Sequence, residues 1–93
     1  MNQKLYVYEG GEIDLSLVTR LYPAALISAG GESASVSLEW ADMKKDQVVL
    51  EAYVLICDFD PVGDVPVNRV EIRFASKEEL FGAMNDIASL IKS

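Results

Sequence analysis

The side chains of this chain that could perform chemistry gather in the stretch YVLICDFDPVGD. Asp58 and Asp60 follow an apolar run, and Asp64 comes shortly after them. Paired carboxylates at the end of a buried strand are typical of sites that hold Mg²⁺ or transfer a chemical group. The same carboxylates beside Pro61 and Gly63 are equally typical of a solvated turn. The stretch therefore raises two possibilities, a catalytic pair or an acidic hairpin loop.

The segment DFDPV resembles the D-x-D-x-[TV] motif of haloacid-dehalogenase-type phosphotransferases. That resemblance implies that Asp58 is a nucleophile and Asp60 an acid/base, with Mg²⁺ neutralising charge between phosphate and carboxylates. The chain departs from the family after the motif, because residues 61–93 supply one loop, one strand and one helix, too little for a parallel sheet with crossover helices. Pro61 also removes a backbone N–H where such a site needs a donor to phosphate. We therefore predict that the chain is not an enzyme and uses no cofactor.

A calcium loop is the other metal possibility in this stretch. Asp58, Asp60 and Gly63 match the first, third and sixth positions of an EF-hand loop. The fifth and twelfth positions should also supply ligands, but they are Val62 and Arg69. We therefore predict no metal site, and the three aspartates of the stretch remain weak, opportunistic candidates. Their expected role is turn chemistry, in which solvated carboxylates accept hydrogen bonds from nearby backbone.

Composition excludes further chemistries. The chain contains no histidine, which removes imidazole acid/base steps, catalytic triads and His-ligated zinc. Cys57 is the only cysteine, so the chain forms no internal disulfide, and its apolar surroundings are typical of a core residue. A single thiol, with no long apolar segment, predicts a cytoplasmic protein.

The charge balance restricts the partners. Eight basic residues against fifteen acidic ones give a net charge of −7 at pH 7. Nucleic-acid binders need Lys or Arg to displace counterions from phosphate, and anionic membrane surfaces attract the same residues. We therefore predict neither a nucleic-acid nor a membrane partner. A basic protein is a favoured partner because opposite charge steers association, although net charge also simply opposes aggregation.

Alternating residues predict strands in the first half of the chain. In residues 4–8, Leu5 and Val7 lie on one face and Tyr6 and Tyr8 on the other, as in a strand. The later segments AALIS and SASVSLEW flank the turn AGGE, whose glycines can adopt the positive φ angles of a tight hairpin. The second strand of this hairpin is expected to continue through residue 40, because Val, Leu and Trp alternate there with polar residues, and a polar turn is expected at 41–46.

Residues 13–22 fit two structures. Asp14 can cap a short helix that ends before Pro23. Ile13, Leu15 and Leu17 also alternate, as they would in a strand. We favour a short helical turn.

The second half of the chain reads as two strands around one loop. Residues 47–59 begin by alternating and then become apolar on both faces, which predicts a long strand in the centre of a sheet. Residues 60–68 contain Pro, Gly, Asp and Asn, which predict a loop. Residues 67–75 predict the final strand, with Val70, Ile72 and Phe74 facing inward and Arg69, Glu71 and Arg73 facing outward.

The C-terminal segment carries the clearest local signal. Ser76 and Glu79 have the spacing of a capping box, in which each side chain accepts a hydrogen bond from the other's backbone. An apolar stripe follows at helical spacing and should pack on the sheet. The stripe comprises Leu80, Met84, Ile87 and Ile91, widened by Phe81 and Ala88.

These elements predict one α+β domain over residues 1–93. Strands joined by short turns favour an antiparallel meander. We expect a meander sheet or small open barrel of five strands closed by the C-terminal helix, which resembles pleckstrin-homology-like domains in outline. The alternative is an open antiparallel sheet with the helix on one face.

With enzymatic chemistry excluded, the sequence favours binding. Tyr6 and Tyr8, joined by Tyr53 and Leu55 of the long strand, would form an aromatic partner-binding patch if they were exposed, and ordinary core if they were covered. We predict a small, acidic, cytoplasmic protein-interaction domain that self-associates as a homodimer. The alternative is an acidic immunity or inhibitor protein that occupies a basic cleft on a partner.

Overall fold

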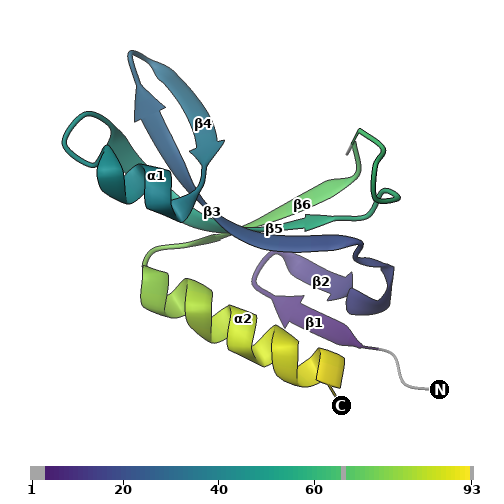
Figure 1. Ribbon diagram of the computed structural model, residues 1–93. Helices are drawn as coiled ribbons and strands as arrows, with labels where there is room; N and C mark the ends of the chain where they lie inside the picture. The colour runs from purple at the N-terminus through teal and green to yellow at the C-terminus, as the bar shows by residue number, and fades with distance from the viewer. Residues whose placement is uncertain (1–3, 66, 93) are drawn as a thin grey trace.

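The computed structural model describes residues 4–65 and 67–92. Its elements form an α+β fold, as the sequence predicts (Figure 1). They are β1 (Leu5–Tyr8), β2 (Gly11–Asp14), the 3-10 helix η1 (Leu15–Leu17), β3 (Arg20–Ala29), β4 (Glu32–Val36), α1 (Leu38–Met43), β5 (Val49–Asp58), β6 (Arg69–Phe74) and α2 (Lys77–Lys92).

The sheet is open rather than closed. Four antiparallel strands lie in the order β4-β3-β5-β6, and β1 and β2 form a separate hairpin. The expected meander or small open barrel of five strands is wrong in two respects within residues 4–65 and 67–92. The consecutive strands β4 and β5 do not pair, because β3 lies between them, and the hairpin strands β1 and β2 pair only with each other, so β4 and β6 remain as open edges. The pleckstrin-homology-like outline is therefore not observed, and the alternative of an open sheet packed by the C-terminal helix is confirmed.

The longest strand pairing joins β3 to β5. It runs from Arg20 opposite Asp58 to Ser28 opposite Val49, and β6 pairs with the other side of β5. The prediction of a central strand here is confirmed. Pro23 is tolerated inside β3 because β4 pairs with β3 only from Ala25 onward, so the side of β3 that lacks an N–H at Pro23 has no neighbouring strand.

The ambiguous residues 13–22 contain both predicted structures. Asp14 caps η1, and its carboxylate accepts hydrogen bonds from the backbone N–H of Ser16 at 3.0 Å and the Ser16 hydroxyl at 2.6 Å. The predicted short helical turn is therefore confirmed. The strands β2 and β3 occupy the residues on either side of it.

The hairpin between β3 and β4 turns at Gly30 and Gly31, with φ angles of 59° and 85°, as predicted. The continuation of that strand through Trp40 is wrong. Ser37 ends it, because its hydroxyl accepts a hydrogen bond from the backbone N–H of Trp40 at 3.1 Å and starts α1. Part of the turn expected at 41–46 therefore belongs to this helix.

One face of the sheet is covered and the other is open. The hairpin, α1 and α2 all lie on the same side of the sheet, and no helix of the described residues lies over the opposite side (Figure 1). The covered side contains the larger core, with Leu55, Cys57 and Ile72 packed against Leu80 and Ile87 of α2. The open side carries a smaller apolar cluster, formed by Ala24, Leu26, Val54 and Ile56.

The apolar stripe of α2 is partly confirmed. Leu80 and Ile87 are fully buried and Met84 is half-buried. Phe81 and Ala88 are exposed, so the prediction that they widen the buried stripe is wrong. Ile91, which was expected within the stripe, is also exposed. The helix instead turns Ala83 and Leu90 toward the core, so the buried stripe lies on the other flank of Leu80.

None of the helices in the described part of the chain is long and apolar enough to cross a membrane.

The Ser76 half of the predicted capping box is present and generates a test, whereas Glu79 bonds to the backbone of Ala75 rather than to that of Ser76. The Ser76 hydroxyl accepts a hydrogen bond from the N–H of Glu79 at 3.2 Å, and the Glu79 carboxylate accepts one from the N–H of Ala75 at 3.1 Å. We expect Ser76→Ala to lower the free energy of unfolding by about 1 kcal/mol. Urea denaturation followed by circular dichroism measures this change, and an unchanged midpoint would show that the cap does not stabilise the helix.

Candidate functional site

Asp58 is buried in an ion pair rather than solvated. Its side chain is only 1% exposed, and one carboxylate oxygen accepts a hydrogen bond from Nε of Arg69 at 2.7 Å. The expectation of a solvated turn residue is therefore wrong for Asp58. The reason is its position: it is the last residue of β5 and lies between Arg20 of β3 and Arg69 of β6 in the sheet.

The guanidinium of Arg69 links this carboxylate to the open face. One of its terminal nitrogens donates to the Tyr22 hydroxyl at 3.1 Å, and the hydrogen bond to Asp58 raises the pKa of Arg69. The second carboxylate oxygen of Asp58 is buried and accepts no hydrogen bond from the described residues. Asp58 is therefore held as a structural anion beneath Arg69.

Asp60 performs the turn chemistry that the sequence predicts. Its carboxylate accepts hydrogen bonds from the backbone N–H groups of Val67 and Asn68, each at 2.8 Å, and from the Asn68 side chain at 3.1 Å. These bonds, above all that from the Asn68 backbone, lower the pKa of Asp60. Thr19 donates to the carbonyl oxygens of both aspartates. Asp60 therefore closes the loop between β5 and β6.

The acidic stretch thus divides into the end of β5, which includes Asp58, and a loop that begins after it. The carboxylates of Asp58 and Asp60 are engaged by Arg69 and by backbone, and the described residues contain no group of three acidic or thiol side chains placed to share a metal ion. Asp64 is exposed and makes no such group with the other two.

Cys57 lies fully buried in the core, as expected. Loss of solvation on burial, with a smaller contribution from the charge of Asp58, raises the pKa of its thiol to about 11. Thiolates, rather than thiols, are the nucleophiles in cysteine chemistry. At neutral pH this side chain is therefore protonated and packs as a small apolar group.

The four residues of the candidate partner patch lie together but pack as core. Leu55 is fully buried, and Tyr6, Tyr8 and Tyr53 are half-buried against the same cluster. The Tyr6 and Tyr8 rings are stacked, with centroids 6.4 Å apart and planes 15° apart. Burial is the main cause of the raised pKa of Tyr6. The side chains of Tyr6 and Tyr8 also border an accessible groove.

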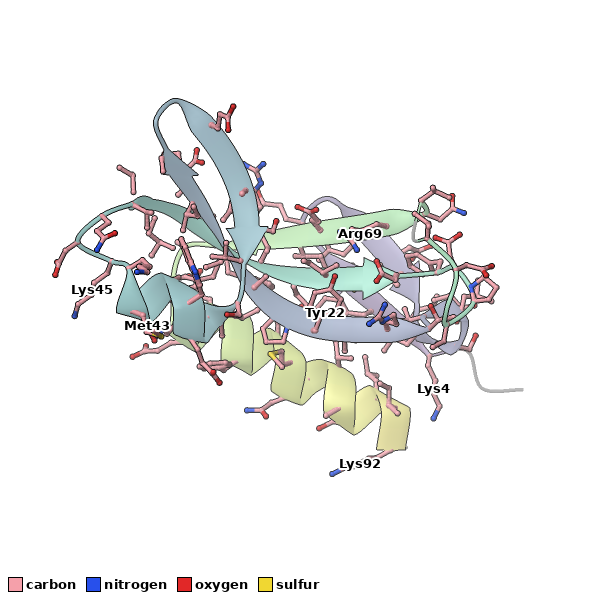
Figure 2. The ribbon with its side chains drawn as sticks, turned by 45° about the horizontal axis from the view of Figure 1, so that its top comes forward. Lys4, Tyr22, Met43, Lys45, Arg69 and Lys92 are labelled. Carbon is pink, nitrogen blue, oxygen red and sulfur yellow. The ribbon has the colours of Figure 1, made fainter. Side chains whose placement is uncertain are left out.

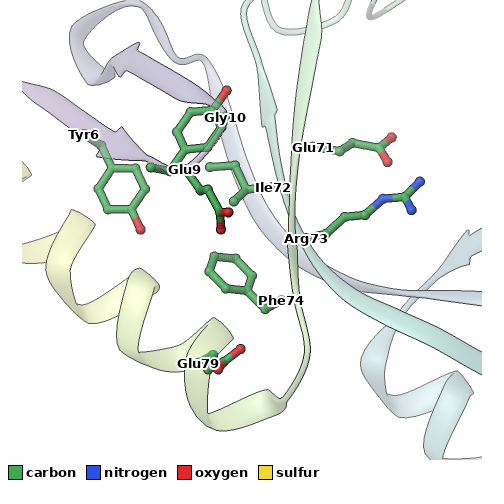
Figure 3. Close-up of a pocket in the computed structure, with 9 residues that line it drawn as sticks. Tyr6, Glu9, Gly10, Glu71, Ile72, Arg73, Phe74 and Glu79 are labelled. Carbon is green, nitrogen blue, oxygen red and sulfur yellow. The ribbon is translucent and has the colours of Figure 1, made fainter.

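That groove runs along the open edge of β6. It has a volume of about 430 Å³ and lies between β6, the tip of the hairpin and the first turn of α2 (Figure 3). Ile72 and Phe74 of β6 point to the same side of the strand as the hairpin tyrosines, whereas Glu71 and Arg73 point to the opposite side. Its remaining lining residues are Glu9, Gly10 and Glu79.

The edge itself offers unpaired backbone. The N–H of Phe59 donates to the carbonyl of Asn68 at 3.0 Å. Because every second residue of an antiparallel strand bonds to a given neighbour, this bond identifies which residues of β6 bond to β5. Counting from Asn68 in steps of two, the backbone groups of Val70, Ile72 and Phe74 bond to β5. The N–H and C=O groups of residues 69, 71 and 73 therefore point away from β5, toward the open edge. No other strand in the described part of the chain pairs with this edge.

A second, smaller hollow lies on the open face of the sheet. It has a volume of about 280 Å³, and its floor is formed by Ala24 and Ile56. Tyr22 and Arg69 lie over this face, as Figure 2 shows. The hydroxyl-bearing residues Ser35 and Ser37 complete its wall.

No family model, curated protein or solved structure matches this chain. The functional interpretation therefore depends on the geometry of the chain itself.

Loss of Arg69 tests the buried ion pair. Removing one partner of such a pair costs about 3–5 kcal/mol, but the Arg69 side chain is 32% exposed, so we expect Arg69→Met to cost about 2 kcal/mol of unfolding free energy. Adding Asp58→Leu removes the uncompensated buried charge and should restore most of that loss. Urea denaturation of both variants measures the effect. Wild-type stability in Arg69→Met would show that Arg69 does not compensate the charge of Asp58.

The lowered pKa of Asp60 gives a pH-dependent test. A carboxyl whose pKa is lower in the folded state stabilises the fold above its unfolded value, near 3.8, and loses that effect as the pH falls through the folded value. We expect Asp60→Asn to melt below the wild type at pH 7 and the difference to shrink below about pH 4. Asp64→Asn, which alters an exposed carboxylate of the same loop, is the control and should match the wild type throughout. A difference that does not depend on pH would contradict the role of the carboxylate charge.

Proposed function

We propose that this chain is a small, non-enzymatic protein-interaction domain that binds an extended protein segment along the open edge of β6. The observation that carries the proposal is the row of outward backbone groups at residues 69, 71 and 73, beside a groove walled by Tyr6, Tyr8 and Phe74. In strand addition, backbone hydrogen bonds supply affinity and side-chain pockets supply specificity. The edge of β6 combines both features.

The other open edge supports this function less well. The outer part of β4 carries Ser33, Ala34 and Ser35, which are small and exposed. An added strand there would gain backbone hydrogen bonds but little apolar contact. The edge of β6 is therefore the better binding surface.

The predicted homodimer is one form of this proposal. Antiparallel pairing of two β6 strands about Ile72 would set Glu71 of each copy opposite Arg73 of the other, a favourable cross-strand charge pair. The net charge of −7 favours the second form, in which the domain acts as an acidic inhibitor of a basic partner. Both forms use a cytoplasmic domain with no nucleic-acid or membrane ligand, and both remain predictions.

Proline substitution tests the edge of β6 without disturbing the sheet. Proline is tolerated on an edge strand where the N–H points to solvent, so we expect Glu71→Pro to fold and to lose strand addition. Ser35→Pro makes the same change on the edge of β4. In the pairing of β4 with β3, residues 32, 34 and 36 bond to β3, so the N–H of residue 35 points away from the sheet. Circular dichroism melts verify that both variants fold.

The binding measurement has two parts. Sedimentation velocity compares the association of the wild type with that of both variants, and affinity capture compares the proteins that each retains. Loss of association or of retained partners in Glu71→Pro, with both kept in Ser35→Pro, is the expected result. Equal behaviour of the two variants would exclude the edge of β6 as the binding surface.

A further inference from the structure

We infer that the hollow on the open face of the sheet binds a small organic acid, with the carboxylate of the acid on Arg69 and its apolar body on the floor of the hollow. This site goes beyond the proposed function, because the hollow lies on the opposite face of the sheet from the groove beside β6. Its volume of about 280 Å³ suits a compact molecule. The class of ligand follows from the cations of this face, the fixed guanidinium of Arg69 and the apolar floor.

All three arginines of the chain lie on the open face. Arg20 is two positions from Tyr22 in β3, so both side chains point to this face. Arg69 and Arg73 alternate along β6 with Ile72, which faces the covered side. The acidic residues among the paired positions of β3, β5 and β6 are Asp58 and Glu71. Positive charge is therefore in excess on this face, although the chain as a whole has a net charge of −7.

The guanidinium of Arg69 is held in place for a ligand. Its Nε donates to Asp58 at 2.7 Å, and one terminal nitrogen donates to the Tyr22 hydroxyl at 3.1 Å. A guanidinium has more N–H groups than these two bonds use, and its planar fork matches a carboxylate. Among the described residues, Arg69 is the only charged one that lines the hollow (Figure 2). Asp58 is 1% exposed and does not line it, so a ligand would meet the guanidinium rather than the carboxylate.

The rest of the hollow selects a molecule with an apolar body. The apolar residues that line it are Pro23, Ala24, Val36 and Ile56. An anion without an apolar part would leave this surface unused, and burial of apolar surface contributes about 25 cal/mol per Å². The hydroxyls of Ser35 and Ser37 border the same space and can bond to a polar substituent of the ligand. The walls therefore suit a carboxylate carried on a compact apolar group.

Benzoate and two analogues test the inference on the full chain. Benzamide keeps the ring and removes the charge, whereas acetate keeps the carboxylate, which an acidic side chain of a protein partner would also offer, and removes the ring. Chemical-shift changes in two-dimensional NMR spectra of the isotope-labelled chain measure binding. We expect benzoate to shift the signals of the residues that line the hollow and to saturate with a Kd on the order of 1 mM. We expect benzamide and acetate each to bind at least about ten-fold more weakly.

Variants of the arginines locate the site. Arg69→Lys keeps a positive charge beside Asp58, so the chain should fold, but it lacks the fork and should weaken benzoate about ten-fold. Arg73→Lys makes the same change on the same strand and face, outside the hollow, and should leave benzoate binding unchanged. Tyr22→Phe removes one anchor of the guanidinium without adding bulk and should weaken benzoate about three-fold. Circular dichroism melts verify that each variant folds.

Every other outcome overturns the inference. Equal binding of benzamide and benzoate would show that the hollow is an apolar cavity with no preference for a carboxylate. Equal binding of acetate and benzoate would assign Arg69 to an acidic side chain of a protein partner instead of an organic acid. Shifts that do not saturate, or benzoate binding that is unchanged in both Arg69→Lys and Tyr22→Phe, would show only general attraction.

Discussion

The structure depends on the pairing of β3 with β5, because all other elements pack on this pair or extend it. The two strands are ten residues long each and pair along nearly their whole length. Side chains that they direct to one face meet the hairpin, α1 and α2, while those on the other face form only a small cluster. A sheet covered on one side and not closed into a barrel necessarily retains two edges, and the edge of β6 is the one that lies beside an aromatic groove.

Asp58 and Asp60, the two aspartates that follow the apolar part of β5, show how position decides the role of a side chain. Asp58 is the last residue of β5, so the neighbouring strands enclose it and Arg69 must compensate its charge. Asp60 lies two residues later, past the end of the sheet, where its carboxylate organises the loop through Asn68. Both carboxylates therefore have structural partners, Arg69 for Asp58 and the loop backbone for Asp60.

Patterns dictated by local chemistry were predictable from the sequence, and those that depend on tertiary contacts were not. The Ser76 cap, the Gly30–Gly31 turn and the inward residues of β6 each follow from a few neighbouring residues. The helix α1 was missed because its alternating apolar residues fit a strand, and only the Ser37 cap indicates otherwise. The groove at β6 was not predictable, because no local pattern says that the hairpin tip lies beside the last strand. Burial of Leu55 was equally a matter of packing.

The loop closed by Asp60 is a natural position for engineering. Its base is fixed by the bonds of Asp60 to Val67 and Asn68, whereas Val62 and Val65 near its tip are 75% and 82% exposed. Exposed loop tips accept inserted sequence, and a longer closed loop adds little entropic cost. A foreign epitope or small domain placed between Val62 and Val65 would leave the anchoring bonds intact. The chain can therefore serve as a compact display scaffold.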